Sequence, residues 1–64
     1  MERFEADQVG DLVRRVIKLG NCILQEEGTG HSLSVFEDFE DKDKEKVTRD
    51  FCAKRQGPFV VYSE

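Results

Sequence analysis

The chain has 64 residues, of which 38% are hydrophobic and another 38% charged, and its formal net charge is −4. A chain this short buries only about 60% of its unfolded surface, so its core is small. The hydrophobic content is too high for a disordered tail, and no apolar run approaches the roughly 20 residues that a membrane-spanning helix needs. We therefore expect one small folded domain, residues 1–64, that does not cross a membrane.

The N-terminus and the cysteine content favour an intracellular protein. Residues 1–5 lack the basic and apolar regions of a secretory signal. Cys22 and Cys52 are thirty residues apart, whereas a secreted domain of this length usually carries several cysteines in a disulfide framework. We expect a cytoplasmic protein in which both cysteines are reduced and buried.

Residues 6–19 show the periodicity of an amphipathic helix. The apolar residues of its buried face are Val9, Leu12, Val13, Val16 and Ile17. Asp7 suits the positive N-terminal end of the helix dipole, and the pair Gly20-Asn21 is typical of a helix stop. This segment predicts the first helix.

Two apolar segments follow, separated by glycines. Residues 21–25 form a short apolar run, and residues 31–37 alternate, with Leu33 and Val35 on one face. Gly28 and Gly30 permit the backbone angles of a tight turn, so we predict a β-hairpin. A competing interpretation starts a helix at Val35 and continues it to residue 55, because Ser34 and Glu37 have the spacing of a capping box.

The last third of the chain predicts a helix and a strand. Residues 41–55 have helical composition, and Val47 and Phe51 mark a narrow apolar stripe. Gly57-Pro58 ends the helix, and residues 59–62 are β-branched and aromatic. The whole predicts an α+β domain of order α-β-β-α-β, with a three-stranded, mainly antiparallel sheet and two helices on one face. Its exposed sheet edges favour a homodimer.

The residue types needed for catalysis or metal binding are sparse. His31 is the only histidine, and nothing in the sequence orients it toward Cys22 or Cys52 as a general base. The cysteines and the histidine lack the paired spacing of a zinc site. The loop at Gly28 and Gly30 lacks the lysine of a phosphate-binding loop. We expect a non-enzymatic protein with no cofactor and no metal.

An acidic run stands out between the predicted hairpin and the second helix. Residues 37–46 contain six carboxylates and three lysines. One interpretation is a solvated helix entry; the functional interpretation is a surface that binds a basic protein, with two phenylalanines as anchors. The predicted partner-binding residues are Phe36, Glu37, Asp38, Phe39, Glu40 and Asp41.

The alternative function is nucleic-acid binding through a local basic patch. Its residues are Arg14, Arg15, Lys18, Lys54 and Arg55. The negative net charge makes this footprint weak, and it requires that both groups of cations lie on the same side of the molecule.

Small acidic domains without catalytic groups are common among inhibitors, antitoxins and phage-encoded modulators of host proteins, which act by occupying a surface. We therefore predict a small acidic protein-binding regulator or inhibitor whose partner has a basic surface.

Overall fold

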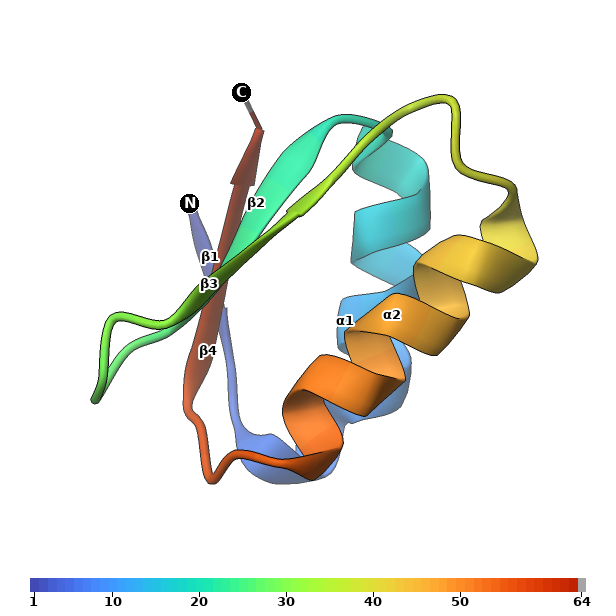
Figure 1. Ribbon diagram of the computed structural model, residues 1–64. Helices are drawn as coiled ribbons and strands as arrows, with labels where there is room; N and C mark the ends of the chain where they lie inside the picture. The colour runs from blue at the N-terminus through green and yellow to red at the C-terminus, as the bar shows by residue number, and fades with distance from the viewer. Residues whose placement is uncertain (64) are drawn as a thin grey trace.

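Residues 1–63 are described by a computed structural model, and they form a four-stranded antiparallel sheet with two helices on one face (Figure 1). The elements in chain order are β1 (Glu2–Phe4), a 3-10 turn η1 (Ala6–Gln8), α1 (Val9–Leu19), β2 (Cys22–Glu26), β3 (Ser32–Val35), α2 (Asp41–Ala53) and β4 (Phe59–Ser63). The strand order is β1-β4-β2-β3. The predicted α+β class, with both helices on one face of an antiparallel sheet, is confirmed.

The sheet has four strands and not the predicted three. The additional strand is β1, which pairs with β4 through Glu2↔Val61, Arg3↔Val60 and Phe4↔Phe59. Three residues, two of them charged, are too short to show the alternation by which a strand is recognised. They become a strand because β4 offers unpaired backbone groups along its outer side.

The segment after α1 forms the predicted hairpin. The strands β2 and β3 pair from Cys22↔Val35 to Gln25↔Ser32, and Gly30, at φ +79°, donates its N–H to the carbonyl oxygen of Glu26 at 2.9 Å. The competing helix starting at Val35 is wrong, because the chain stays extended there and α2 begins only at Asp41. Cross-strand pairing outweighs a local capping pattern at this position.

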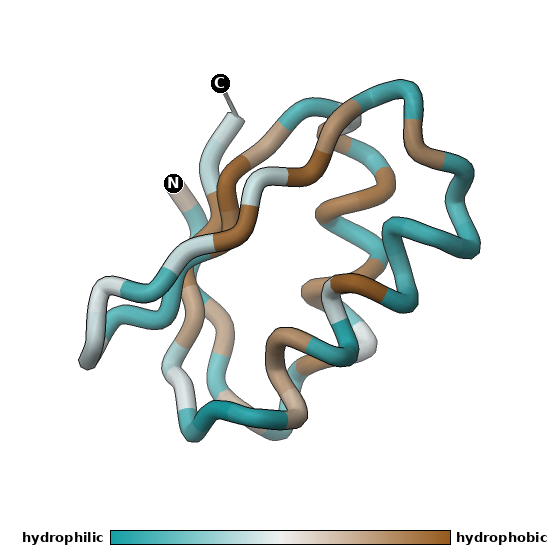
Figure 2. The backbone as a smooth tube through the Cα atoms, in the orientation of Figure 1, coloured by the Kyte–Doolittle hydropathy of each residue, from teal (hydrophilic) through white to brown (hydrophobic). Residues whose placement is uncertain are grey.

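The core lies between the sheet and the helices. Leu12 and Val16 of α1 pack against Leu24 and Phe59 of the central strands, and all four are fully buried. Figure 2 shows hydrophobic residues along α1, β2 and β4, whereas α2 and the segment before it are mostly hydrophilic. The inner face of α2 still contributes Phe51 and Cys52 to the core, and its other side chains are mostly exposed.

The two helices run in opposite directions (Figure 1). Gly20 ends α1 with φ +80°, a backbone angle that suits glycine, and so confirms the predicted stop. No helix within residues 1–63 combines the length and the hydrophobicity that a membrane crossing requires. Because the helices are antiparallel, the C-terminal end of α1 lies near the N-terminal end of α2 and the acidic residues around it.

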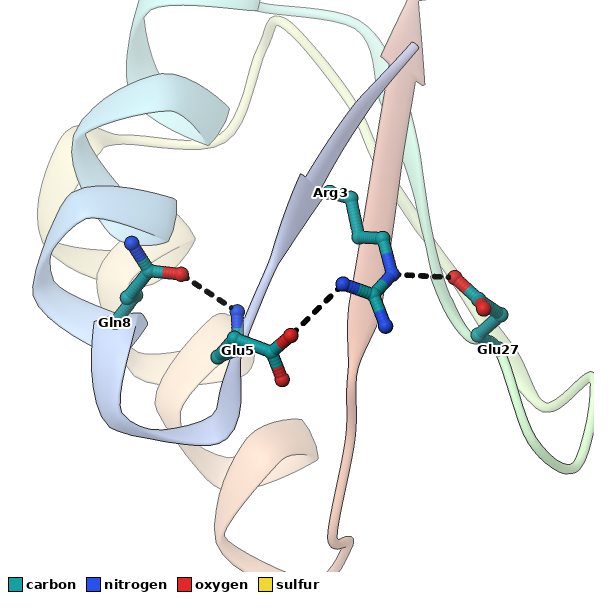
Figure 3. A network of polar contacts seen from close by, with 4 residues as sticks. All are labelled: Arg3, Glu5, Gln8 and Glu27. Atoms are coloured by element: carbon teal, nitrogen blue, oxygen red, sulfur yellow. Dashed lines mark hydrogen bonds and ion pairs between the residues drawn. The ribbon is translucent and has the colours of Figure 1, made fainter.

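The β1 edge is tied to the rest of the sheet by a polar network on its uncovered face (Figure 3). The Arg3 guanidinium donates from Nε to Oε2 of Glu27 at 3.0 Å and from Nη1 to Oε1 of Glu5 at 2.8 Å. The backbone N–H of Glu5 donates to Oε1 of Gln8 at 2.7 Å, which anchors the start of η1. This edge of the sheet is therefore short and charged, and the charged side chain of Arg3 is held by two carboxylates.

Candidate functional site

The predicted partner-binding residues are consecutive and run from the end of β3 to the first residue of α2. We call this stretch, residues 36–41, the acidic loop. Phe36 is 45% exposed, whereas Phe39 is half-buried and packs against the core. The N–H of Phe39 donates to the carbonyl oxygen of Phe36 at 3.1 Å, so the chain turns between them. All four acidic residues of the loop are exposed.

The two phenylalanines form an aromatic pair at the base of an open hollow. Their ring centroids are 5.8 Å apart at an interplanar angle of 67°, an edge-to-face arrangement. The hollow measures about 570 Å³ and is lined by Asn21, Phe36, Glu37, Asp38 and Phe39. One apolar ring is therefore accessible beside two carboxylates.

Asn21 holds the acidic loop in place. Its side-chain Oδ1 accepts the backbone N–H of Glu37 at 2.7 Å, and its Nδ2 donates to Oε2 of Glu37 at 3.3 Å. The sequence indicated Asn21 only as part of a helix stop, and its reach to residue 37 depends on the two chain segments meeting in space. A loop anchored in this way loses less conformational freedom when a partner binds.

Of the four carboxylates of the acidic loop, one forms an ion pair within residues 1–63. Within the part of the chain described, no ion pair involves Glu37, Asp38 or Asp41. Glu40 has a lysine partner, Lys42, at 4.0 Å, which is the outer limit for an ion pair. The negative charge of the loop is thus available to an outside cation.

The other lysines interleaved with the acidic run do not neutralise the loop. Lys46 lies 3.6 Å from Asp50, one turn further along α2, and Lys44 is only 5% exposed. Arg49 pairs with Glu45 at 2.8 Å across one helical turn. The charges balance along α2 but not in the loop that precedes it.

The alternative basic patch is divided between two separate parts of the molecule. Because α1 and α2 are antiparallel, Lys18 near the end of α1 is far from Lys54 and Arg55 beyond α2 (Figure 1). The two arginines of α1 are also engaged: Arg14 contacts Asp11 and Arg15 contacts Glu2. The structure does not bring the five cations together.

The cysteines and the histidine lie in different surroundings. Cys22 opens β2 opposite Val35, whereas His31 lies at the other end of the hairpin, with its Nδ1 3.0 Å from Nη1 of Arg55. Both cysteines are buried, and burial raises the pKa of Cys52 to about 11. A thiol with this pKa is protonated at neutral pH and is a poor nucleophile. Residues 1–63 contain no group of three or more His, Cys, Asp or Glu side chains placed to hold a metal ion.

One buried carboxylate was not anticipated from the sequence. Glu26, 6% exposed, accepts the Thr29 hydroxyl at 2.8 Å and the backbone N–H groups of Gln56 and Gly57, each at 3.0 Å. The hydrogen bond from Thr29 lowers the pKa of Glu26 most, and these two N–H groups and the charge of Arg55 lower it further against the opposing effect of burial. This arrangement joins the hairpin to the α2–β4 connection and satisfies the carboxylate internally.

Comparisons of the chain with protein-family models, with curated proteins and with solved structures found no match.

Proposed function

We propose that the protein is a non-enzymatic regulator or inhibitor that binds a protein partner with a basic surface through its acidic loop. The observation that supports this proposal is the exposed ring of Phe36 beside carboxylates that have no cationic partner within residues 1–63. The other acidic and basic side chains of α2 pair mostly with each other. The loop differs from them in presenting both apolar surface and uncompensated charge.

Aromatic side chains are enriched in protein interfaces, where a few anchors carry much of the binding energy. In the acidic loop, the Phe36 ring offers apolar area, and the edge-to-face contact with Phe39 limits the orientations that it samples. Glu37 is held by Asn21, so little ordering is needed on binding. These features favour a partner-binding role for the acidic loop over the interpretation that it is only a solvated helix entry.

The negative charge determines which partner fits. Exposed carboxylates attract a basic surface over a distance comparable with the Debye length, which is about 8 Å at physiological ionic strength. Such attraction raises the association rate and is weakened by salt. We take the partner to be a basic protein of the cytoplasm whose working surface is covered when the complex forms.

The test compares two variants that change the net charge equally. Asp38→Lys/Asp41→Lys removes negative charge from the acidic loop, whereas Asp7→Lys/Asp11→Lys makes the same change beside the start of α1. Each variant and the unmodified chain are used to capture partners from nuclease-treated lysate of the source organism, and association rates are then measured with the purified partner. We expect the first variant to associate at least about tenfold more slowly and the second to behave nearly as the unmodified chain.

Two results contradict the proposal. If both charge variants bind a stoichiometric partner equally well, the acidic loop is not the binding surface. If capture yields only nuclease-sensitive material, the alternative of nucleic-acid binding gains support. The variant Phe36→Ala keeps every charge, and its weaker binding identifies the aromatic anchor separately from the electrostatic attraction.

A further inference from the structure

The two edges of the sheet differ in how well they are protected against pairing with another strand. The β1 edge has three residues, and the side chain of Arg3 is held by Glu5 and Glu27 (Figure 3). Short length and charge are the usual protections of a sheet edge. The opposite edge, β3, contains Ser32–Val35 without a charge or a proline, and its outer side carries no further strand (Figure 1).

The backbone groups that point out of the β3 edge belong to Ser32 and Ser34. The N–H of Glu26 donates to the carbonyl oxygen of His31 at 2.8 Å, so these two residues form a hydrogen-bonded pair of the hairpin. Antiparallel strands alternate, so the pairs Leu24↔Leu33 and Cys22↔Val35 are also hydrogen-bonded. The N–H and C=O groups of Ser32 and Ser34 therefore face away from β2.

We propose that two copies of the chain pair edge to edge through β3, in antiparallel register about a twofold axis at Leu33. The segment Ser32-Leu33-Ser34 reads the same in both directions. In this register, Ser32 lies opposite Ser34 of the second copy, and each such pair exchanges two backbone hydrogen bonds. A register shifted by one residue would place inward-facing backbone groups at the interface and lose these bonds.

The charges at the two ends of β3 select a second copy as the occupant. Beyond Val35 the chain carries Glu37 and Asp38, whereas at the other end Lys54 and Arg55 line a hollow together with His31 and Glu26. The Glu26 carboxylate already accepts hydrogen bonds from Thr29, Gln56 and Gly57, which leaves the two cations at the rim of this hollow. Antiparallel pairing about Leu33 places residue 36 of one chain beside residue 30 of the other. Glu37 and Asp38 of each chain then lie on the side of Lys54 and Arg55 of the second copy, so these charges attract across the interface in both directions.

The helix face of the same edge supports the pairing. A hollow of about 260 Å³ opens between β3 and α2, and Leu33, Val47 and Phe51 form its apolar lining. Leu33 is only half-buried in one chain. In the dimer the two Leu33 side chains face each other across the axis and cover apolar surface that a single chain exposes.

The first test measures the molecular mass in solution by sedimentation equilibrium at protein concentrations from about 1 μM to 1 mM, a range that detects association of moderate affinity. We expect the mass to rise from 7.4 kDa toward twice that value. Ser34→Pro removes the outward N–H while leaving the hydrogen bonds to β2 intact, so it should weaken the dimer about tenfold or more. Ser34→Ala keeps that N–H and should dimerise like the unmodified chain.

A pair of double variants tests the register. Ser32→Lys/Ser34→Lys places like charges opposite each other in both symmetry-related pairs, whereas Ser32→Lys/Ser34→Glu places opposite charges there. Both variants change side chains on the uncovered face of the sheet, and circular dichroism confirms that each is folded. We expect the first to be monomeric and the second to be dimeric.

A chain that stays monomeric over the whole concentration range overturns the inference. So does a dimer that is equally insensitive to Ser34→Pro and to the paired lysines, because another surface must then form it. Ser34→Pro retains every carboxylate of the acidic loop, so loss of the dimer and loss of binding to a basic protein are measured separately.

Discussion

Glu26 and the acidic loop contain the same kind of side chain in opposite surroundings. Glu26 is 6% exposed and accepts hydrogen bonds from a hydroxyl and two backbone N–H groups. Glu37, Asp38 and Asp41 are exposed, and none of them forms an ion pair within residues 1–63. The Glu26 carboxylate is hydrogen-bonded within the fold, whereas the carboxylates of the acidic loop face solvent. Burial and the supply of hydrogen-bond donors, and not residue type, separate these two groups of acids.

The largest effect should come from removing the buried carboxylate. Glu26→Ala leaves the N–H groups of Gln56 and Gly57 without their acceptor and creates a cavity beside the hairpin. We expect the midpoint of thermal unfolding to fall by about 10 °C or more, measured by circular dichroism. The control is Asp38→Ala in the acidic loop, where we expect a shift of less than about 3 °C. Equal shifts would remove the distinction between the two regions.

The backbone that surrounds Glu26 offers a second way to break the arrangement. Gly57 has φ +72°, and a Cβ atom there would lie 2.9 Å from Cε2 of the buried Phe59 ring. Gly57→Ala should therefore destabilise the fold by about 1 to 2 kcal/mol, measured by urea unfolding. Gly28→Ala is the matched control, since no atom lies within 4 Å of its added Cβ. A neutral Gly57→Ala would show that this connection adapts freely.

Acid pH should weaken the Glu26 arrangement. The pKa of Glu26 is lower in the folded chain than its ordinary value of 4.5, so its contribution to stability is fully present above pH 4.5. That contribution is lost as the pH falls through the lower folded-state pKa. We expect the free energy of unfolding of the unmodified chain to decrease below pH 4.5 more steeply than that of Glu26→Gln. Parallel pH profiles of the two chains would exclude Glu26 as a source of acid sensitivity.

A smaller effect is expected where the acidic loop is anchored. Asn21→Ala removes both hydrogen bonds to Glu37 and should cost about 1 kcal/mol of stability. Because the loop then has more conformations to lose, binding of the basic partner should weaken more than stability does. Calorimetric titration of the partner, alongside urea unfolding, separates the two quantities. Unchanged affinity would mean that the anchoring of the loop has no part in recognition.

The smallest effect on stability should come from the exposed aromatic ring. Phe36→Ala removes a side chain that is 45% exposed, so we expect a loss of only about 0.5 kcal/mol in urea unfolding. Phe39→Ala should cost more, because Phe39 packs against the core. If Phe36→Ala lowers the free energy of unfolding more than Phe39→Ala does, Phe36 stabilises the fold and is not a free anchor for a partner.

Local patterns predicted most of the elements correctly. The periodicity of residues 6–19 marked α1, the glycines at 28 and 30 marked the hairpin turn, and Gly57-Pro58 separated α2 from β4. These signals act within a few residues, so they can be read along the chain. The missed strand β1 and the choice between strand and helix at Val35 both depended on pairing partners that are distant in sequence.

The acidic loop was identifiable by its composition, but its two phenylalanines had no assignable roles before the fold was known. The exposure of Phe36, the burial of Phe39 and the anchoring by Asn21 follow from how β3, α1 and α2 meet. Whether the cations of the basic patch lie together also depended on the fold, since antiparallel helices place its two halves apart (Figure 1).

The sequence by itself determined the class of the domain, its two helices, the turn at Gly28 and Gly30 and the concentration of negative charge around the start of α2. Only the tertiary structure decided that Glu26 is buried and internally satisfied, that β1 completes the sheet and that β3 leaves an uncharged edge exposed. The physical reason is the range of the interactions: helix periodicity and turn preferences act between near neighbours, whereas hydrogen bonding of a buried carboxylate or a strand edge requires groups that only folding brings together.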